Sequence, residues 1–265
     1  MSMFTSRRLL GFLVVSLVFS LPLHARGLDW YTFSAEAVKD SSLSVSASLG
    51  HGRNTGDQAI DGLSVDAPIV QLNLGLGERA EAIVGYSLYR QRNNADVSVS
   101  GGGDPYFFTK LNFYQANVEY LPSAAFIWGV IEPAANRPLG DDRLSFYALL
   151  ALSWQLDDIT FDVNYGAGIF ESFNEDGQID VIQFSTAAHY DVRETLRFSS
   201  EFVYEERIVG FWLDFTGGYD SPFSRRHLTL KSDFGNRLQW SASVTRGLIE
   251  QSGDWAGNVG YRYHF

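Results

Sequence analysis

The stretch that decides the fold is residues 158–170, DITFDVNYGAGIF, in which apolar residues alternate with polar or small ones. Ile159, Phe161 and Val163 fall on one face, and Asp162 falls on the other. A period of two predicts a β-strand whose two faces meet different environments. The stretch is longer than the ~5–6 residues usual for a strand of a globular protein. A tilted strand that crosses a membrane needs ~9–11 residues, which this stretch supplies.

The same alternation recurs along the chain and predicts twelve strands. They lie near residues 42–50, 67–76, 79–91, 105–115, 122–132, 143–155, 158–170, 178–190, 195–207, 225–234, 237–248 and 255–265. The connections between them are alternately short and long, as in outer-membrane barrels, where periplasmic turns are short and outer loops are long. We therefore predict an all-β fold, a 12-stranded antiparallel transmembrane β-barrel of the outer-membrane type, over residues 42–265.

The first 25 residues have the layout of a secretory signal peptide. Arg7 and Arg8 precede an apolar run over residues 9–21, and Ala25 is a small residue at a candidate cleavage point. The run is too short for a membrane-spanning helix, which needs ~20 residues. We expect cleavage of residues 1–25, export through the inner membrane and a place in the bacterial outer membrane. Residues 26–41 are then an N-terminal periplasmic segment, a plug of the lumen or a short extra strand.

The charge and the cysteine count exclude several classes of protein. The net charge is −11, and loss of the signal peptide, which holds two arginines and no acid, makes it more negative. Binding of nucleic acid is disfavoured because phosphate contacts need Lys and Arg. With no cysteine, a small disulfide-stabilised secreted fold is excluded. The partners we expect are outer-membrane lipid and lipopolysaccharide, the barrel-assembly machinery and a small-molecule solute of unknown identity.

The inward faces of the predicted strands carry polar and charged side chains of both signs. The candidate lumen-lining and selectivity residues are Glu81, Lys110, Asn112, Asp162, Asn164, Gln183, His189, Arg197, Glu201, Glu205, Lys231, Asp233 and Arg262. These side chains either line a narrow path for solutes or pair with one another as a polar core. Twelve strands enclose more space than side chains fill easily, since about eight suffice for a filled barrel. Tyr147 and Leu149 also point inward, so the lumen is mixed and suits small aromatic or amphipathic solutes.

An outer-membrane enzyme is the alternative class. His189 shares a face with Ser185 and lies near Ser199 on the neighbouring strand, which is the residue set of a Ser–His nucleophile. The chain has no G-x-S-x-G or H-E-x-x-H motif and no histidine cluster at metal-binding spacing. We expect no catalytic residue, no metal and no cofactor. A lipid-modifying enzyme and a closed structural barrel without transport stay as alternatives to a channel.

The middle of the chain resembles the outer-membrane transporter family associated with phenol meta-cleavage pathways. The resemblance lies in residues 74–79 (LGLGER), 102–104 (GGD) leading to Lys110, 137–141 (RPLGD) and 163–166 (VNYG). Leu139 stands where that family tends to have threonine. The resemblance implies a membrane barrel that takes up hydrophobic compounds. It favours a channel or facilitator for passive passage of small, hydrophobic or aromatic molecules, rather than an enzyme.

Barrels of this type also resemble one another in ending on an aromatic residue. Tyr261, Tyr263 and Phe265 match that pattern, and all three fall on the expected lipid face of the last strand. The resemblance implies that the assembly machinery recognises this terminal segment.

Overall fold

The alternating stretch forms β9 (Ile159–Glu171), which pairs antiparallel with β8 and β10. The computed structural model describes residues 32–36, 41–52, 62–93, 98–118, 120–135, 139, 144–171, 178–193, 195–207, 225–235, 237–248 and 255–265. The proposed signal peptide and the 208–224 loop lie outside the described residues. None of the described residues forms a helix long and apolar enough to cross a membrane.

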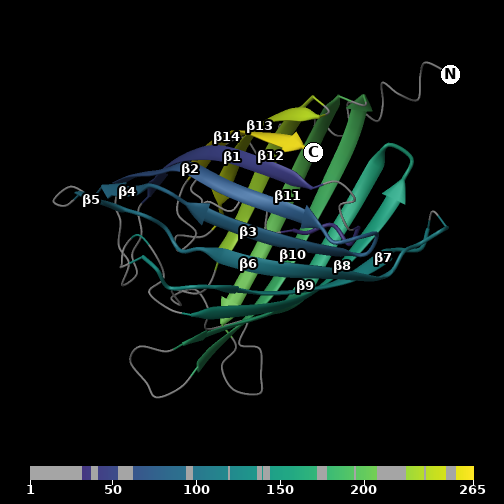
Figure 1. The fold of residues 1–265 in the computed structure, drawn as a ribbon, viewed down its shortest axis with the longest axis horizontal. Coiled ribbons are helices and arrows are strands. Elements are labelled where there is room, and N and C mark those ends of the chain that lie inside the picture. Colours follow the sequence, from purple (N-terminus) through teal and green to yellow (C-terminus); the bar gives the residue numbers. More distant parts are fainter. Residues whose placement is uncertain are drawn as a thin grey trace.

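Twelve of the strands close into an antiparallel barrel (Figure 1). The strands are β1 (Ser42–Gly52), β2 (Gly62–Gly75), β3 (Ala80–Ser87), β4 (Arg90–Asn93), β5 (Ser98–Gly101), β6 (Tyr106–Tyr114), β7 (Ser123–Ile131), β8 (Ser145–Leu156), β9, β10 (Gln178–Arg193), β11 (Leu196–Arg207), β12 (Arg225–Phe234), β13 (Leu238–Gly247) and β14 (Trp255–His264). Sequential neighbours pair around the ring, and β1 closes it by pairing with both β2 and β14. The predicted strand number and antiparallel closed topology are therefore confirmed.

The structure departs from the prediction around residues 79–104. The predicted strand 79–91 is interrupted after Ser87, and β4 and β5 occupy part of the predicted loop 92–104. The interruption lies opposite Pro68, which has no N–H to donate to the ladder, although Leu88 N–H still donates to the Pro68 carbonyl. The register against β2 is the same on both sides, with Ser87 opposite Ile69 and Arg90 opposite Asp66. β4 then pairs with the extended outer end of β2, so β4 and β5 form a hairpin beyond the barrel wall. The prediction of an uninterrupted strand followed by a loop was wrong here.

The short connections lie at the end of the barrel where β1 begins and β14 ends. Gly77 (φ 89°) and Gly235 (φ 107°) adopt the left-handed backbone region in two of these turns. Asp157 (φ 52°) does so in the β8–β9 turn, and aspartate is one of the few residues with a side chain that tolerates it. Gly77, Asp157 and Gly235 of the predicted turns thus have the backbone geometry that tight reversals need.

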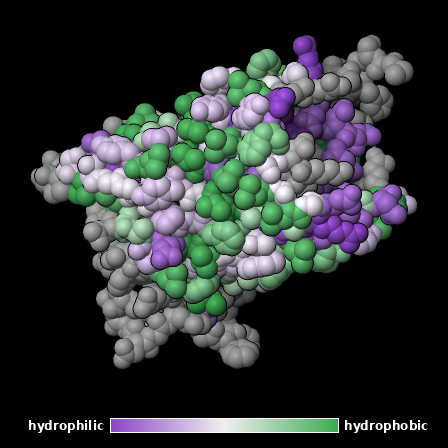
Figure 2. Space-filling model, in the orientation of Figure 1, coloured by the Kyte–Doolittle hydropathy of each residue, from purple (hydrophilic) through white to green (hydrophobic). Residues whose placement is uncertain are grey.

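The outer face of the barrel is apolar. Large side chains that alternate with buried ones are exposed, among them Leu111 (44%), Phe126 (41%), Leu150 (39%) and Trp240 (56%). Figure 2 shows hydrophobic residues gathered over the middle of the strands and hydrophilic ones towards the right-hand end. Exposed apolar area on this scale is the surface that a barrel presents to lipid.

Substitution of outward leucines by arginine tests this surface at two depths of one strand. Leu150 lies in the middle of β8, whereas Leu156 lies at its end, and both are exposed. Leu150→Arg should lower the free energy of unfolding in phospholipid vesicles by about 2–4 kcal/mol, and Leu156→Arg by about 0–1 kcal/mol. Denaturant titration followed by tryptophan fluorescence measures both. Equal losses at the two positions would contradict a lipid-facing belt.

Candidate functional site

The structure places the thirteen predicted lumen residues on the inner face of the wall. Eight of them line one cavity of about 520 Å³ near the short-turn end: Glu81, Lys110, Asp162, His189, Arg197, Lys231, Asp233 and Arg262. Asn112, Asn164 and Glu201 are buried deeper and contact residues 32–36. Gln183 and Glu205 are buried further along β10 and β11. Their role in selectivity stays a prediction.

Residues 32–36 lie inside the barrel, and barrel side chains take the place of a neighbouring strand. The Asn164 side chain accepts a hydrogen bond from Phe33 N–H (2.6 Å) and donates one to the Phe33 carbonyl (2.8 Å). Glu201 accepts from Thr32 N–H (2.6 Å), and Asn112 donates to the Ala35 carbonyl (2.9 Å). A buried backbone needs partners for its polar groups, and here β6, β9 and β11 supply them. The segment is thereby held to the wall.

Lys110 ties the segment to a buried ion pair. Its ammonium lies 2.6 Å from Glu81 Oε2, and both side chains are almost fully buried. It also donates to the carbonyl oxygens of Ser34 (3.2 Å) and Glu36 (2.6 Å). Asn73 donates to the other Glu81 oxygen at 2.7 Å. A buried charge that is paired in this way is a structural element of the lumen, because removal of one partner leaves the other uncompensated.

A hydrogen-bonded series of side chains crosses β8, β9, β10 and β11 beneath the segment. Ser153 Oγ accepts from Ala35 N–H (2.7 Å) and donates to Asp162. Asp162 Oδ2 lies 3.0 Å from His189 Nε2, and His189 Nδ1 lies 2.8 Å from Ser199 Oγ. Ser199, His189 and Asp162 therefore have the connectivity of a catalytic triad. Ser199, however, is buried and does not line the cavity, whereas His189 and Asp162 do.

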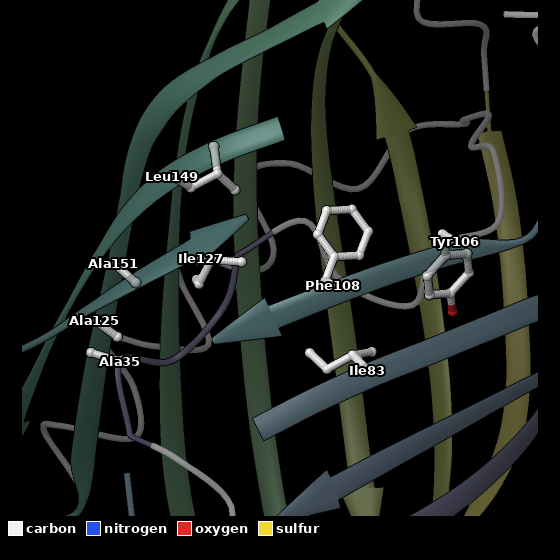
Figure 3. Close-up of a cluster of buried hydrophobic side chains, with 8 residues drawn as sticks. All are labelled: Ala35, Ile83, Tyr106, Phe108, Ala125, Ile127, Leu149 and Ala151. Atoms are coloured by element: carbon white, nitrogen blue, oxygen red, sulfur yellow. The ribbon is translucent and has the colours of Figure 1, made fainter. Parts of the chain in front are cut away.

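The wall formed by β3, β6, β7 and β8 carries a cluster of apolar side chains on its inner face (Figure 3). Ala35 of the segment is fully buried among Ile127, Leu149 and other side chains of this cluster. Phe33 packs on Phe108 with ring centroids 5.8 Å apart. This wall thus carries an apolar cluster beside the Glu81–Lys110 pair, and residues 32–36 contact both.

Two glycines make room for the aromatic side chains of this wall. The Tyr106 ring occupies the space that a Cβ atom on Gly85 would need, and the Phe108 ring does the same at Gly129. Both glycines lie on strands that pair with β6. Without a side chain on the neighbouring strand, each ring lies along the wall rather than across the lumen, which keeps part of the interior empty.

Sequence reasoning missed Ser153, Tyr106 and Phe108 as lumen residues. The alternation within β6 could have identified Tyr106 and Phe108, because both lie an even number of residues from Lys110 and Asn112 and so share their inward face. Ser153 likewise has the parity of Leu149 in β8. The expectation of a polar lumen concealed the two aromatics.

Comparison with known proteins identifies similar folds. No protein-family model matches the sequence, and no curated protein matches it. The fold is similar to the COG4313 outer membrane channel from Pseudomonas putida F1, with a TM-score of 0.63 and 13% identity over 90% of this chain and 100% of that one. It is also similar to the NanC porin (TM-score 0.59, 7% identity, 84% and 100% covered) and to the KdgM porin in complex with disordered oligogalacturonate (0.55, 8%, 84% and 99%). These likenesses show the fold of an outer-membrane barrel.

The hydrogen bonds that attach residues 32–36 to the barrel wall can be tested by substitution of Asn164. Asn164→Ala removes both hydrogen bonds to Phe33, each contributing about 0.5–1.5 kcal/mol, so amide exchange within residues 32–36 should accelerate roughly tenfold or more. Hydrogen–deuterium exchange with mass spectrometry measures it. Asn258→Ala is the matched control, because Asn258 lies on β14, opposite Ser48 of β1. Unchanged exchange in Asn164→Ala would show that the Asn164 hydrogen bonds do not protect these amides.

Proposed function

We propose that this chain is an outer-membrane channel for small amphipathic or aromatic molecules, and that its N-terminal segment closes the channel at rest. The observation that carries the proposal is the cavity of about 520 Å³, bounded by residues 32–36 on one side and by the barrel wall on the other. A barrel filled by its own side chains would leave no such space.

The mixed lining supports the class of solute. Phe33, Ile83, Tyr106 and Phe108 supply an apolar surface, and the charged side chains of β9 to β14 supply polar contacts. Binding sites for small molecules combine an apolar lining with a few polar groups that orient the ligand. The similar structures include an outer membrane channel and two porins, which supports this proposal. The resemblance to phenol-pathway transporters favours hydrophobic cargo.

Closure by the segment follows from its contacts. Residues 32–36 are joined to four strands by hydrogen bonds from Glu201, Asn164, Ser153, Asn112 and Lys110. These are side-chain contacts rather than a continuous strand ladder, so they can be broken without opening the barrel. The segment is in this proposal a plug, one of the three roles expected for residues 26–41.

We propose that the protein is located in the bacterial outer membrane. The apolar belt on the outer face is the surface that outer-membrane lipid and lipopolysaccharide would contact. Tyr261, Tyr263 and Phe265 lie on that face and are exposed, as an assembly signal read by the barrel-assembly machinery requires. The signal peptide proposed for residues 1–25 would direct export.

A hydrolytic enzyme is the second candidate, because Ser199, His189 and Asp162 are hydrogen-bonded in the order of a triad. A nucleophile must reach its substrate, and Ser199 does not line the cavity. The series instead ends on Ala35 N–H through Ser153, which gives it a role in holding the segment. We therefore favour the structural role.

The channel proposal predicts the effect of removing the plug. Deletion of residues 32–36 should raise single-channel conductance in planar bilayers several-fold over the intact protein, since the contacts that fill this part of the lumen are lost. Heat-dependent mobility on gels checks that the deleted protein still forms a barrel. A folded deletion variant with no conductance above that of the intact protein would contradict closure by this segment.

The enzyme candidate has its own test. We expect the intact protein, Ser199→Ala and His189→Ala to release equally little fatty acid from phospholipid vesicles. Fatty-acid release is measured with purified protein folded into those vesicles, and empty vesicles give the background. Hydrolysis by the intact protein that both substitutions abolish would establish the enzyme instead.

A further inference from the structure

Arg262 differs from the other cations of the lumen in its pairing. It lies on β14 next to Ser44 of β1 and Gln239 of β13, and its side chain lines the cavity. Lys110, Arg197 and Lys231 each have a carboxylate within 4.0 Å, at Glu81, Asp191 and Asp233. Among the described residues, Arg262 has neither an ion pair nor a hydrogen bond from its side chain, and its Nε is buried without a partner.

A guanidinium in this state has unused capacity for an anion. A buried donor without an acceptor is unfavourable, and more so when it is charged. The planar guanidinium presents paired N–H donors that match the two oxygens of a carboxylate. The carboxylates of Glu81, Asp191 and Asp233 are occupied by their own cations, and Asp162 by His189 and Ser153. Glu36, which also lines the cavity, is exposed.

The rest of the cavity determines what carries the anionic group. Ile83, Tyr106 and Phe108 line it from β3 and β6, and Phe33 lines it from the plug. On the ring of strands, β14 is separated from β3 by β1 and β2, so the cation and the apolar wall are on different sides of the cavity. A ligand that contacts both needs a charged end and an apolar body. A cavity of about 520 Å³ is within the ~300–1,000 Å³ usual for small-molecule sites.

We infer that the cavity binds amphipathic carboxylates, with the carboxylate on Arg262 and the apolar or aromatic body against Phe33, Tyr106 and Phe108. The inference deepens the proposed function and rests on it only in that the lumen receives solutes. Arg262 is then a specificity residue: it favours an acid over the neutral amide of the same shape. Lys110, Arg197 and Lys231, held by their carboxylates, contribute to the wall.

The test compares naphthylacetate with its neutral amide, naphthylacetamide, by equilibrium dialysis. The full mature protein is used in phosphatidylcholine nanodiscs, with empty nanodiscs as background. The intact protein should bind the acid at least about tenfold more tightly than the amide, because charge-assisted hydrogen bonds contribute about 1.5–3 kcal/mol. Arg262→Gln should reduce that preference to within about twofold. Arg237→Gln is the matched control, since Arg237 carries the same charge but lies exposed in a turn at the same end.

Each outcome decides the inference. Equal binding of acid and amide by the intact protein, no binding of either, or a preference that survives in Arg262→Gln overturns it. If Arg262→Gln does not fold, Arg262→Lys keeps the charge but loses the paired donors, and retention of the full preference there overturns the inference. Binding in nanodiscs needs no permeation. An Arg262-dependent preference without conductance would therefore contradict only the channel, and conductance without a preference would contradict only this inference.

Discussion

Closure of the sheet by the β1–β14 ladder is the constraint on which the rest of the structure depends. The ladder runs from Ser42 opposite His264 to His51 opposite Trp255, and it leaves the ring without a free edge. In a closed sheet the backbone polar groups are satisfied within the wall, so only side chains meet the surroundings. Alternation then divides those side chains completely: one set, such as Leu150 and Trp240, faces outward, and the other faces a lumen that must be filled or left open.

The absence of a free edge also explains how residues 32–36 are held. A segment inside a closed barrel cannot add to the sheet, yet its buried N–H and C=O groups still need partners. Asn164 meets this need because its amide offers an acceptor and a donor side by side, as a neighbouring backbone would. Lys110 and Glu201 add charged partners at either side. The buried polar residues of the lumen thus have a structural reason to be there that is independent of any solute.

The period-two alternation of the sequence was sufficient to predict the strands and which face of each strand meets lipid. A shift by one residue would exchange the lipid and lumen sides of a whole strand. Lys110 and Asp162 were placed inward for this reason. Parity alone does not say which inward residues touch one another. The contact of Asn164 with Phe33 joins residues 131 positions apart, and no local pattern encodes it. The interruption after Ser87 was likewise missed, although Pro68, which lies opposite Leu88 and has no N–H for the ladder, can be read in the sequence.

A packed core and a solute path would both place the same residue types in the lumen. The two interpretations differ in whether the charged side chains are paired with one another. A lysine such as Lys110, which is paired with Glu81 and donates to two carbonyl oxygens, cannot exchange partners with a passing solute without exposing a buried charge. A cation without a carboxylate can accept an anion and release it at little cost to the wall. In the proposed channel the lumen therefore divides by function: the paired residues on the β6 to β11 side would hold the plug, and the β14 side, with Arg262, would recognise the solute.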